Sequence, residues 1–295
     1  MDLKTAVVIP TKGRPREVSN LLRALALQTV LPDMIVVSAC DRTDVEQDVA
    51  GERNVNVLFG PPGLAAQRNR ALSLVQDSCD IVVFFDDDFI PSRFWIERIR
   101  MLIAMHPDVG CVTGRILADG AMTGGLSWPD GQSIVDKADS SAKMANMVDQ
   151  IRRDESPYGC NMAFRSKTIE HLRFDERLVL YGWLEDRDFG FRAAAEGRTV
   201  STDLIWGVHL GTTRGRISGL RFGYSQMVNP WYLMKKGSMK PFDACRCILR
   251  WISSNAVGVI LQNSTVDRWG RLKGNLIGIK DIMFGNWAPE KVTEL

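Results

Sequence analysis

The stretch Ile81-Val82-Val83-Phe84-Phe85-Asp86-Asp87-Asp88 places three carboxylates directly after five apolar residues. A short run of β-branched and aromatic residues predicts a strand that is covered on both faces within a parallel sheet. Open α/β folds bind their ligands in the crevice beyond the carboxyl ends of such strands. We therefore expect Asp86, Asp87 and Asp88 to lie at a ligand site.

Three adjacent carboxylates are costly unless a positive charge or water compensates them, because each raises the proton affinity of the others. Mg²⁺ or Mn²⁺ would serve, since both accept oxygen ligands and complete their shells with water and substrate phosphates. The alternative is a solvated acidic turn before the next helix, with Pro91 in the first turn of that helix. The three residues alone leave both interpretations open.

Apolar runs alternate with helical patterns through the first half of the chain. They predict strands at 6–9, 34–38, 55–59 and 81–85, and helices at 16–28, 64–75 and 94–105. Such alternation is typical of right-handed βαβ units. We expect an α/β fold with a mostly parallel central sheet flanked by helices.

The second half of this region is less regular. A further strand is predicted at 109–117, whereas 118–157 lacks periodicity and is expected to be a variable loop region beside the acceptor. A helix at 184–196, ended by Gly197, and a strand at 199–208 follow.

The composition excludes several classes of protein. The 295 residues are 45% hydrophobic and 24% charged, as in a soluble globular protein with a sizeable core. The first residues lead into a strand without the pattern of a secretory signal, so we expect a cytoplasmic protein. The six cysteines contain no Cys-x-x-Cys pair, which argues against a zinc site. No apolar run reaches the roughly 18 residues of a membrane-spanning helix.

The C-terminal part is basic. Residues 231–295 hold ten Lys or Arg against five Asp or Glu, although the net charge of the whole chain is only +2. Beside Arg246 and Arg250, one predicted helical face carries apolar residues: Phe242, Cys245, Ile248, Leu249, Ile252 and Val259. Such a helix either lies in an anionic membrane surface or packs on the rest of the chain or a second copy. We divide the chain into an α/β domain, 1–220, and a helical, basic amphipathic extension, 221–295.

A second acidic group, Glu185-Asp186, opens the predicted helix at 184–196. Alone, such a pair is typical of a helix cap. It occurs, however, in an ordered set of segments: Pro10-Thr11, Gln67-Arg68-Asn69-Arg70, Asp86-Asp87-Asp88, Gly159 to Arg165 and Tyr181 to Arg192. This set, which covers residues 5–211, resembles the family 2 inverting glycosyltransferases of the GT-A fold.

The resemblance implies a nucleotide-sugar donor, held by the loops that follow the first strands. The donor-binding residues that it implies are Pro10, Thr11, Asp41, Arg68, Asp86 and Asp87. Asp88 corresponds to the metal ligand, so that Mg²⁺ or Mn²⁺ is the implied cofactor. For Arg68, a solvated helical arginine is the alternative.

Asp186 corresponds to the general base of the similar enzymes, and Glu185 to a residue that orients acceptor or donor hydroxyls. A sugar hydroxyl is a poor nucleophile until a carboxylate accepts its proton, and a diphosphate leaves poorly until a metal offsets its growing charge. A base on the acceptor side and a metal on the leaving-group side permit in-line displacement with inversion at the anomeric carbon.

His209 precedes a loop that contains Arg214 and Arg216. We expect this loop to close over the diphosphate, with His209 bound to the metal or a phosphate and the two arginines as clamps. Asn161, in the matched segment Gly159 to Arg165, is a further candidate for contact with a phosphate or the acceptor.

These features predict a metal-dependent, inverting transferase that moves a sugar from a nucleotide diphosphate sugar to a saccharide hydroxyl. The expected acceptor is a lipid-linked saccharide in the assembly of a bacterial cell-surface polysaccharide, which would place the enzyme peripherally on the inner face of the plasma membrane. Homo-oligomerisation stays open.

Two other functions are disfavoured. A nucleotidyltransferase would need a glycine-rich basic loop after its first strand, and Pro10 to Pro15 lacks the repeated glycines. A non-catalytic protein that binds a nucleotide or a partner would not need the base Asp186. Nucleic acid is not an expected partner, because the basic excess lies in the tail and the central cleft is acidic.

Overall fold

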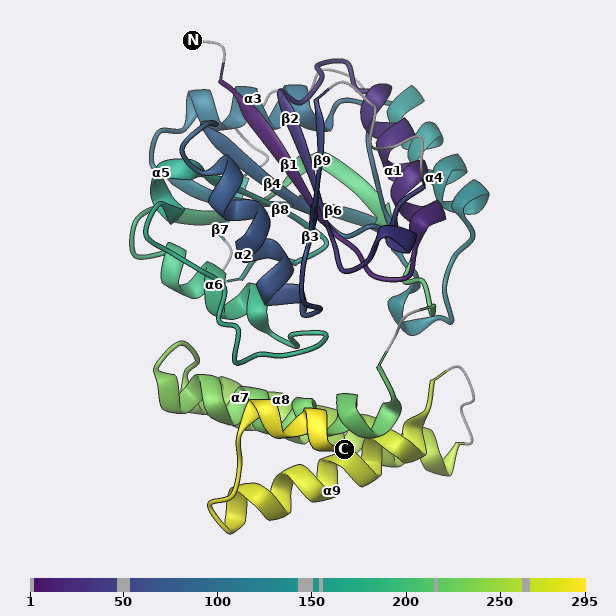
Figure 1. Ribbon diagram of the computed structural model, residues 1–295, viewed down its shortest axis with the longest axis vertical. Coiled ribbons are helices and arrows are strands. Elements are labelled where there is room, and N and C mark those ends of the chain that lie inside the picture. Colours follow the sequence, from purple (N-terminus) through teal and green to yellow (C-terminus); the bar gives the residue numbers. More distant parts are fainter. Residues whose placement is uncertain (1–2, 47–53, 143–150, 154–155, 215–216, 262–265) are drawn as a thin grey trace.

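The computed structural model describes residues 3–46, 54–142, 151–153, 156–214, 217–261 and 266–295. A nine-stranded sheet with the order β3-β2-β1-β4-β8-β6-β9-β5 forms its centre, and β7 pairs with β9 (Figure 1). The strands are β1 Thr5–Pro10, β2 Met34–Ala39, β3 Val55–Phe59, β4 Ile81–Phe85, β5 Phe89–Pro91, β6 Val109–Asp119, β7 Ile151–Arg153, β8 Asn161–Arg165 and β9 Arg198–His209.

The first four strands of this order run parallel. Val7 of β1 pairs with Ile35 of β2 on one side and with Val83 of β4 on the other. Beyond β4 the sheet is mixed, since β8 is antiparallel to β4 and to β6, whereas β6 and β9 are parallel. The register brings the residues that follow β1, β2 and β4 to one edge of the sheet.

Helices cover both faces of the sheet, as the sequence predicts. The first core layer joins one face to α1 Pro15–Ala26 and α3 Trp95–Met105. The second joins the other face to α2 Leu64–Val75, α5 Ser166–Ile169 and α6 Glu185–Ala193. Alternate residues of β1 point to opposite layers, which explains why the central strands are apolar without alternation.

The prediction that 118–157 is a variable loop region is wrong in part. Strand β6 continues to Asp119, and a 3-10 helix at Gly120–Met122 and α4 Trp128–Ser140 follow it. The hydroxyl of Ser127 caps α4 by accepting a hydrogen bond from the Asp130 N–H. Two hydrogen bonds join the end of this helix to the α/β unit. The Asp139 carboxylate accepts them from the Ser92 hydroxyl and the Trp206 indole. The apolar contacts of α4 are few, since Trp128, Ile134 and Val135 join a small core cluster, and so short an apolar face gives a weak periodic signal.

Three helices form the C-terminal extension: α7 Gly219–Lys236, α8 Pro241–Ile260 and α9 Arg268–Met283, followed by a 3-10 helix at Pro289–Glu294. Figure 1 shows them as a layer beneath the α/β unit. The predicted division at residue 220 falls in the first turn of α7. None of the described helices is long and apolar enough to cross a membrane.

The extension packs on the loop that leads into α6. Trp251 of α8 lies edge-on to Trp183, with ring centroids 5.4 Å apart. A polar tie adds to this contact: the fully buried Asp188 of α6 accepts a hydrogen bond from Ser238 at 2.6 Å and pairs with Lys236 at 2.9 Å. The extension therefore bears directly on the start of α6, where the second acidic pair lies.

Candidate active site

The cluster after β4 is buried and charge-compensated. Asp87 accepts a hydrogen bond from the Thr11 hydroxyl at 2.7 Å and pairs with Arg14 Nη1 at 2.8 Å. The same nitrogen lies 3.6 Å from Asp88. Burial raises the pKa of the Asp87 carboxyl, and Arg14 opposes that rise. The arrangement is a built site and not a solvated turn.

Arg14 is a functional residue that the sequence reasoning missed. Besides the two carboxylates, its guanidinium binds the carbonyl oxygens of Thr212 at 3.1 Å and Arg214 at 2.8 Å. It therefore ties the loop after β1 to the loop after β9. The sequence feature that could have identified Arg14 is its position in the loop after β1, the strand that lies beside β4.

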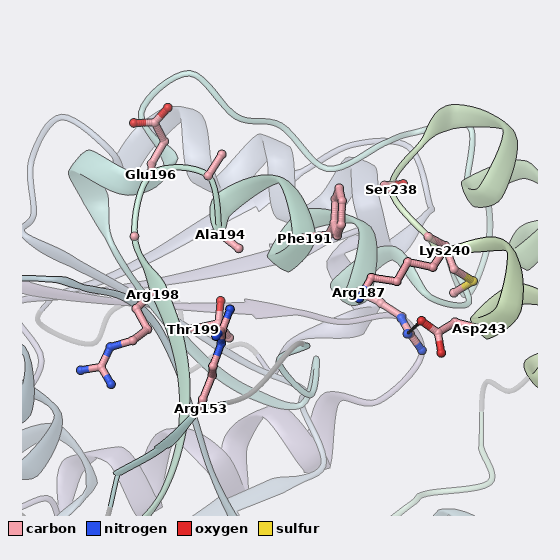
Figure 2. Close-up of a pocket in the computed structure, with 13 residues that line it drawn as sticks. Arg153, Arg187, Phe191, Ala194, Glu196, Arg198, Thr199, Ser238, Lys240 and Asp243 are labelled. Carbon is pink, nitrogen blue, oxygen red and sulfur yellow. Dashed lines mark ion pairs between the residues drawn. The ribbon is translucent and has the colours of Figure 1, made fainter.

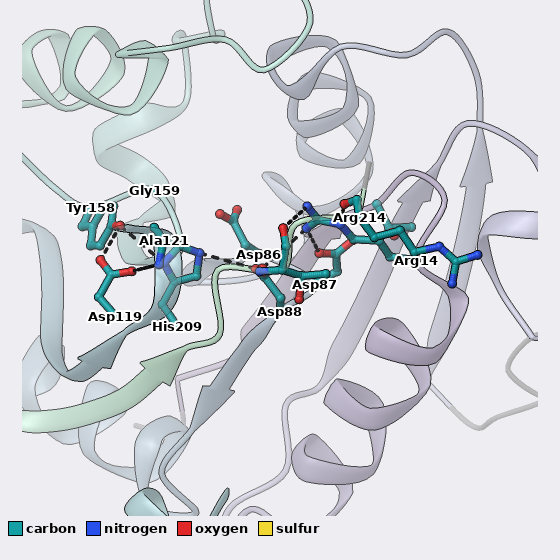
Figure 3. A network of polar contacts seen from close by, with 12 residues as sticks. Arg14, Asp86, Asp87, Asp88, Asp119, Ala121, Tyr158, Gly159, His209 and Arg214 are labelled. Carbon is teal, nitrogen blue, oxygen red and sulfur yellow. Dashed lines mark hydrogen bonds and ion pairs between the residues drawn. The ribbon is translucent and has the colours of Figure 1, made fainter. Parts of the chain in front are cut away.

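His209 stands opposite Asp88 at the end of β9. Its Nε2 lies 3.5 Å from Asp88, and its Nδ1 lies 2.9 Å from the carboxylate of Asp119. Tyr158 donates a hydrogen bond to the other oxygen of Asp119 at 2.9 Å (Figure 3). Burial would lower the pKa of His209, but Asp119 and Asp88 raise it to about 10. Asp119 and Tyr158 were not predicted, although Asp119 pairs with His209 in the register of β6 and β9.

Asp86, Asp88 and His209 could hold a metal ion, since one ligand atom from each lies within 4.8 Å of the others. Two carboxylates and one imidazole suit a divalent cation such as Mn²⁺. Asp119 engages Nδ1 of the imidazole and leaves Nε2 toward Asp88, which is the usual outer-shell arrangement of a metal-binding histidine. The residues present thus fit the predicted cofactor.

The second acidic pair begins α6 and is joined to the first cluster by Arg68. This fully buried guanidinium forms ion pairs with Asp86, at 3.0 Å, and with Glu185, and it also binds the Gly159 carbonyl at 2.9 Å. Burial raises the pKa of Glu185 to about 8, against the opposing charge of Arg68. Arg68 is therefore no solvated helical arginine.

Asp186 is held by the backbone. Its Oδ2 accepts a hydrogen bond from the Gly159 N–H at 2.8 Å, and its Oδ1 accepts one from the Arg187 N–H at 2.7 Å. Burial raises its pKa, although Arg68 and the Gly159 N–H oppose the rise. The preceding Leu184 has φ +71°, a left-handed conformation that costs energy for a branched side chain and often occurs at functional sites.

The loops after β1 and β2 are joined by residues that the sequence did not single out. The Gln67 amide donates to the carbonyls of Thr11 and Ser38, and the Asp44 carboxylate accepts the Gly13 N–H at 2.6 Å. Asp41, one of the predicted donor-binding residues, is exposed beside them. Two hydrogen bonds from Thr43 to one oxygen of this carboxylate lower its pKa, and its contact with the donor stays a prediction.

A comparison with protein families matches residues 6–171 to Glycosyl transferase family 2. The chain belongs to this family. Comparison with curated proteins gives no match. Among solved structures, S. aureus TarS is similar with a TM-score of 0.52 and 16% identity over 79% of this chain and 40% of that one. TarS 1-349 in complex with UDP-GlcNAc gives 0.51 and 15%, over 79% and 67%. GalNAc-T7 with UDP, GalNAc and Mn²⁺ gives 0.54 and 13%, over 80% and 51%.

Family membership and these neighbours confirm the predicted GT-A fold and place the chain among the family 2 glycosyltransferases. The chain spans 40% of the length of TarS. Residues predicted for the donor and for the two acidic groups converge. Pro10 ends β1, Thr11 follows it and binds Asp87, and Arg68 joins Asp86 to Glu185.

Three predicted residues remain, of which the structure describes Asn161 and Arg214. The side chain of Asn161 is fully buried and accepts a hydrogen bond from the Trp95 indole at 3.0 Å, so its contact with a ligand stays a prediction. Arg214 is exposed, and its backbone carbonyl binds Arg14. Arg216 lies outside the described residues.

A groove of about 710 Å³ lies away from these residues, between α6, the start of β9 and the link from α7 to α8 (Figure 2). Arg187 and Phe191 of α6 line it, together with Lys240, and Arg187 pairs with Asp243 at 3.7 Å. None of the carboxylates of the two acidic groups lines this groove. It is therefore separate from the candidate active site.

Proposed function

We propose that this protein transfers a sugar from a nucleotide diphosphate sugar to a saccharide hydroxyl, with inversion at the anomeric carbon. The observation that carries the proposal is Arg68, which links the donor-side Asp86 to Glu185, next to the candidate base Asp186. Two acidic groups, joined by one buried cation, meet at one edge of the sheet. That is the arrangement that base-assisted displacement of a diphosphate requires.

In the proposed reaction, one oxygen of Asp186 accepts the proton of the acceptor hydroxyl as the new glycosidic bond forms. The N–H groups of Gly159 and Arg187 hold this carboxylate in one orientation. Its raised pKa makes it a stronger base than an ordinary aspartate. A divalent cation bound by Asp86, Asp88 and His209 would supply the positive charge that stabilises the diphosphate leaving group.

We also propose which class of donor and which class of acceptor the protein uses. TarS was solved with UDP and with UDP-GlcNAc, and GalNAc-T7 with UDP, GalNAc and Mn²⁺. These ligands make uridine diphosphate hexoses the first donors to test, and a hexosyl group the sugar transferred. We further propose a lipid-linked saccharide of cell-surface polysaccharide assembly as acceptor, which would keep the enzyme on the inner face of the plasma membrane.

Calorimetric titration tests the donor site. Nucleoside diphosphates and their sugar conjugates are titrated with Mn²⁺ and then with chelator. We expect metal-dependent binding of one nucleotide, lost in Asp88→Ala and kept in Asp77→Ala, an exposed aspartate away from the site. Equal binding with chelator, or by Asp88→Ala, would contradict the metal role. Binding without any turnover over an acceptor panel would indicate a non-catalytic nucleotide-binding protein.

A further inference from the structure

The helices α8 and α9 present large apolar side chains to solvent. On α8, Phe242 is 76% exposed and Leu249, seven residues later, is 64% exposed. On α9, Trp269, Leu276 and Met283 follow each other at intervals of seven residues, with exposed fractions of 57%, 62% and 75%. Seven residues are two helical turns, so each series forms one stripe along its helix.

These side chains are not needed to hold the extension together, because the helices pack through small and polar residues. A Cβ at Gly274 of α9 would lie 2.0 Å from the Leu220 carbonyl oxygen of α7. Between α8 and α9, the buried Asn255 donates to Asn275 at 2.8 Å. The contacts among the three helices thus use other faces and leave the two stripes outward. Of the apolar face predicted on α8, Phe242 and Leu249 are exposed, whereas Ile248 and Ile252 are partly buried.

The stripes are flanked by positive charge. On α9, Lys273 and Lys280 are exposed and lie at helical spacing from Trp269, Leu276 and Met283. On α8, Arg246 and Arg250 are exposed beside Leu249. From residue 244 to residue 280 the sequence has a single acidic residue, Asp267, whose carboxylate caps α9 by accepting the Gly270 N–H.

We infer that α8 and α9 dock on an anionic lipid surface. Apolar side chains interspersed with Lys and Arg match the interface of a bilayer, where the rings and aliphatic groups enter the acyl boundary and the long cations reach lipid phosphates. A second copy of this chain is a poorer occupant. A two-fold contact would bring two patches of the same positive charge together, since Asp267 is the one acidic residue between 244 and 280.

Docking in this way would also fix the active site relative to the lipid. Trp251 of α8 contacts Trp183, two residues before Glu185. The surface that meets the bilayer and the loop that carries the acidic pair are therefore joined by one ring contact. An acceptor carried by a lipid would reach the site without leaving the membrane.

Flotation of the full chain with vesicles tests the inference. Vesicles of phosphatidylcholine alone are compared with vesicles that also contain phosphatidylglycerol. We expect preferential binding to the anionic vesicles, reduced about tenfold or more in Lys273→Glu with Lys280→Glu, because two attractive charges become repulsive. Trp269→Ser with Leu276→Ser should reduce binding to a similar degree, whereas the apolar control Leu27→Ser with Leu31→Ser should not.

The charge control is Lys137→Glu with Lys167→Glu, an exposed pair outside the extension. Equal binding to both kinds of vesicle, no binding to either, or wild-type binding by Lys273→Glu with Lys280→Glu would overturn the inference. A dimer in sedimentation that Leu276→Ser abolishes, with no vesicle binding, would identify a second copy as the occupant. Vesicle binding needs no turnover, so its outcome is independent of the donor titration.

Discussion

The two acidic groups of the site differ in what neutralises them. Asp87 and Asp88 face Arg14 and His209. The hydrogen bond and charge of His209, together with Arg14 and the Thr212 N–H, outweigh burial and lower the pKa of Asp88. Glu185 and Asp186 share a single buried cation, Arg68, and burial raises the pKa of both. In the first group Asp88 therefore keeps its negative charge for a cation, although burial raises the pKa of Asp87, and the second group is arranged to accept a proton. Similar residues thus gain different chemistry from their surroundings.

The largest expected effect is on the proton acceptor. Asp186→Asn keeps the shape but removes the base, so we expect transfer to fall about 10²–10⁴-fold, while donor affinity in calorimetry stays the same. In the wild type, transfer should rise with pH through the raised pKa of Asp186, because only the ionised carboxylate accepts a proton. A variant that retains turnover and this pH dependence would place the base elsewhere.

Removal of the shared cation should destabilise the fold. Arg68→Met leaves Asp86 and Glu185 without a buried partner, which costs about 3–5 kcal/mol in the free energy of unfolding. Denaturant titration measures this cost, with Arg23→Met on the exposed side of α1 as the control. A loss no greater than that of the control would show that the two acidic groups are independent of each other.

The smallest expected effect is on the orientation of His209. Asp119→Asn removes the carboxylate charge from Nδ1 and should weaken Mn²⁺ binding about 10–100-fold, as outer-shell changes commonly do. Calorimetry of Mn²⁺ binding measures it, with Asp136→Asn, an exposed residue of α4, as the control. Unchanged Mn²⁺ affinity would show that the charge of Asp119 does not support the metal site through His209.

The sequence was sufficient to predict the central strands. Ile81 to Phe85, for example, is buried on both faces, and its short apolar run is typical of such a strand. The sequence also singled out Asp88, His209 and Asp186 as candidates, because their neighbours in the chain form recognisable segments, and their roles stay predictions. It missed Arg14, Asp119 and α4, since these depend on pairing between strands far apart in the chain. No local pattern reports a carboxylate that faces a histidine 90 residues away.

The contacts of Asp188 with Lys236 and Ser238 limit how the chain can be engineered. Its carboxylate is fully buried, and two of its partners, Lys236 and Ser238, come from the far end of α7. If the chain were cut before Gly219, Asp188 would lose its ion pair with Lys236. Of its present ion pairs, only the one with Arg192 would remain. The extension is therefore not an exchangeable module: a chimera that replaces it must carry a cation and a hydroxyl to the same place, or lose the helix on which catalysis is proposed to depend.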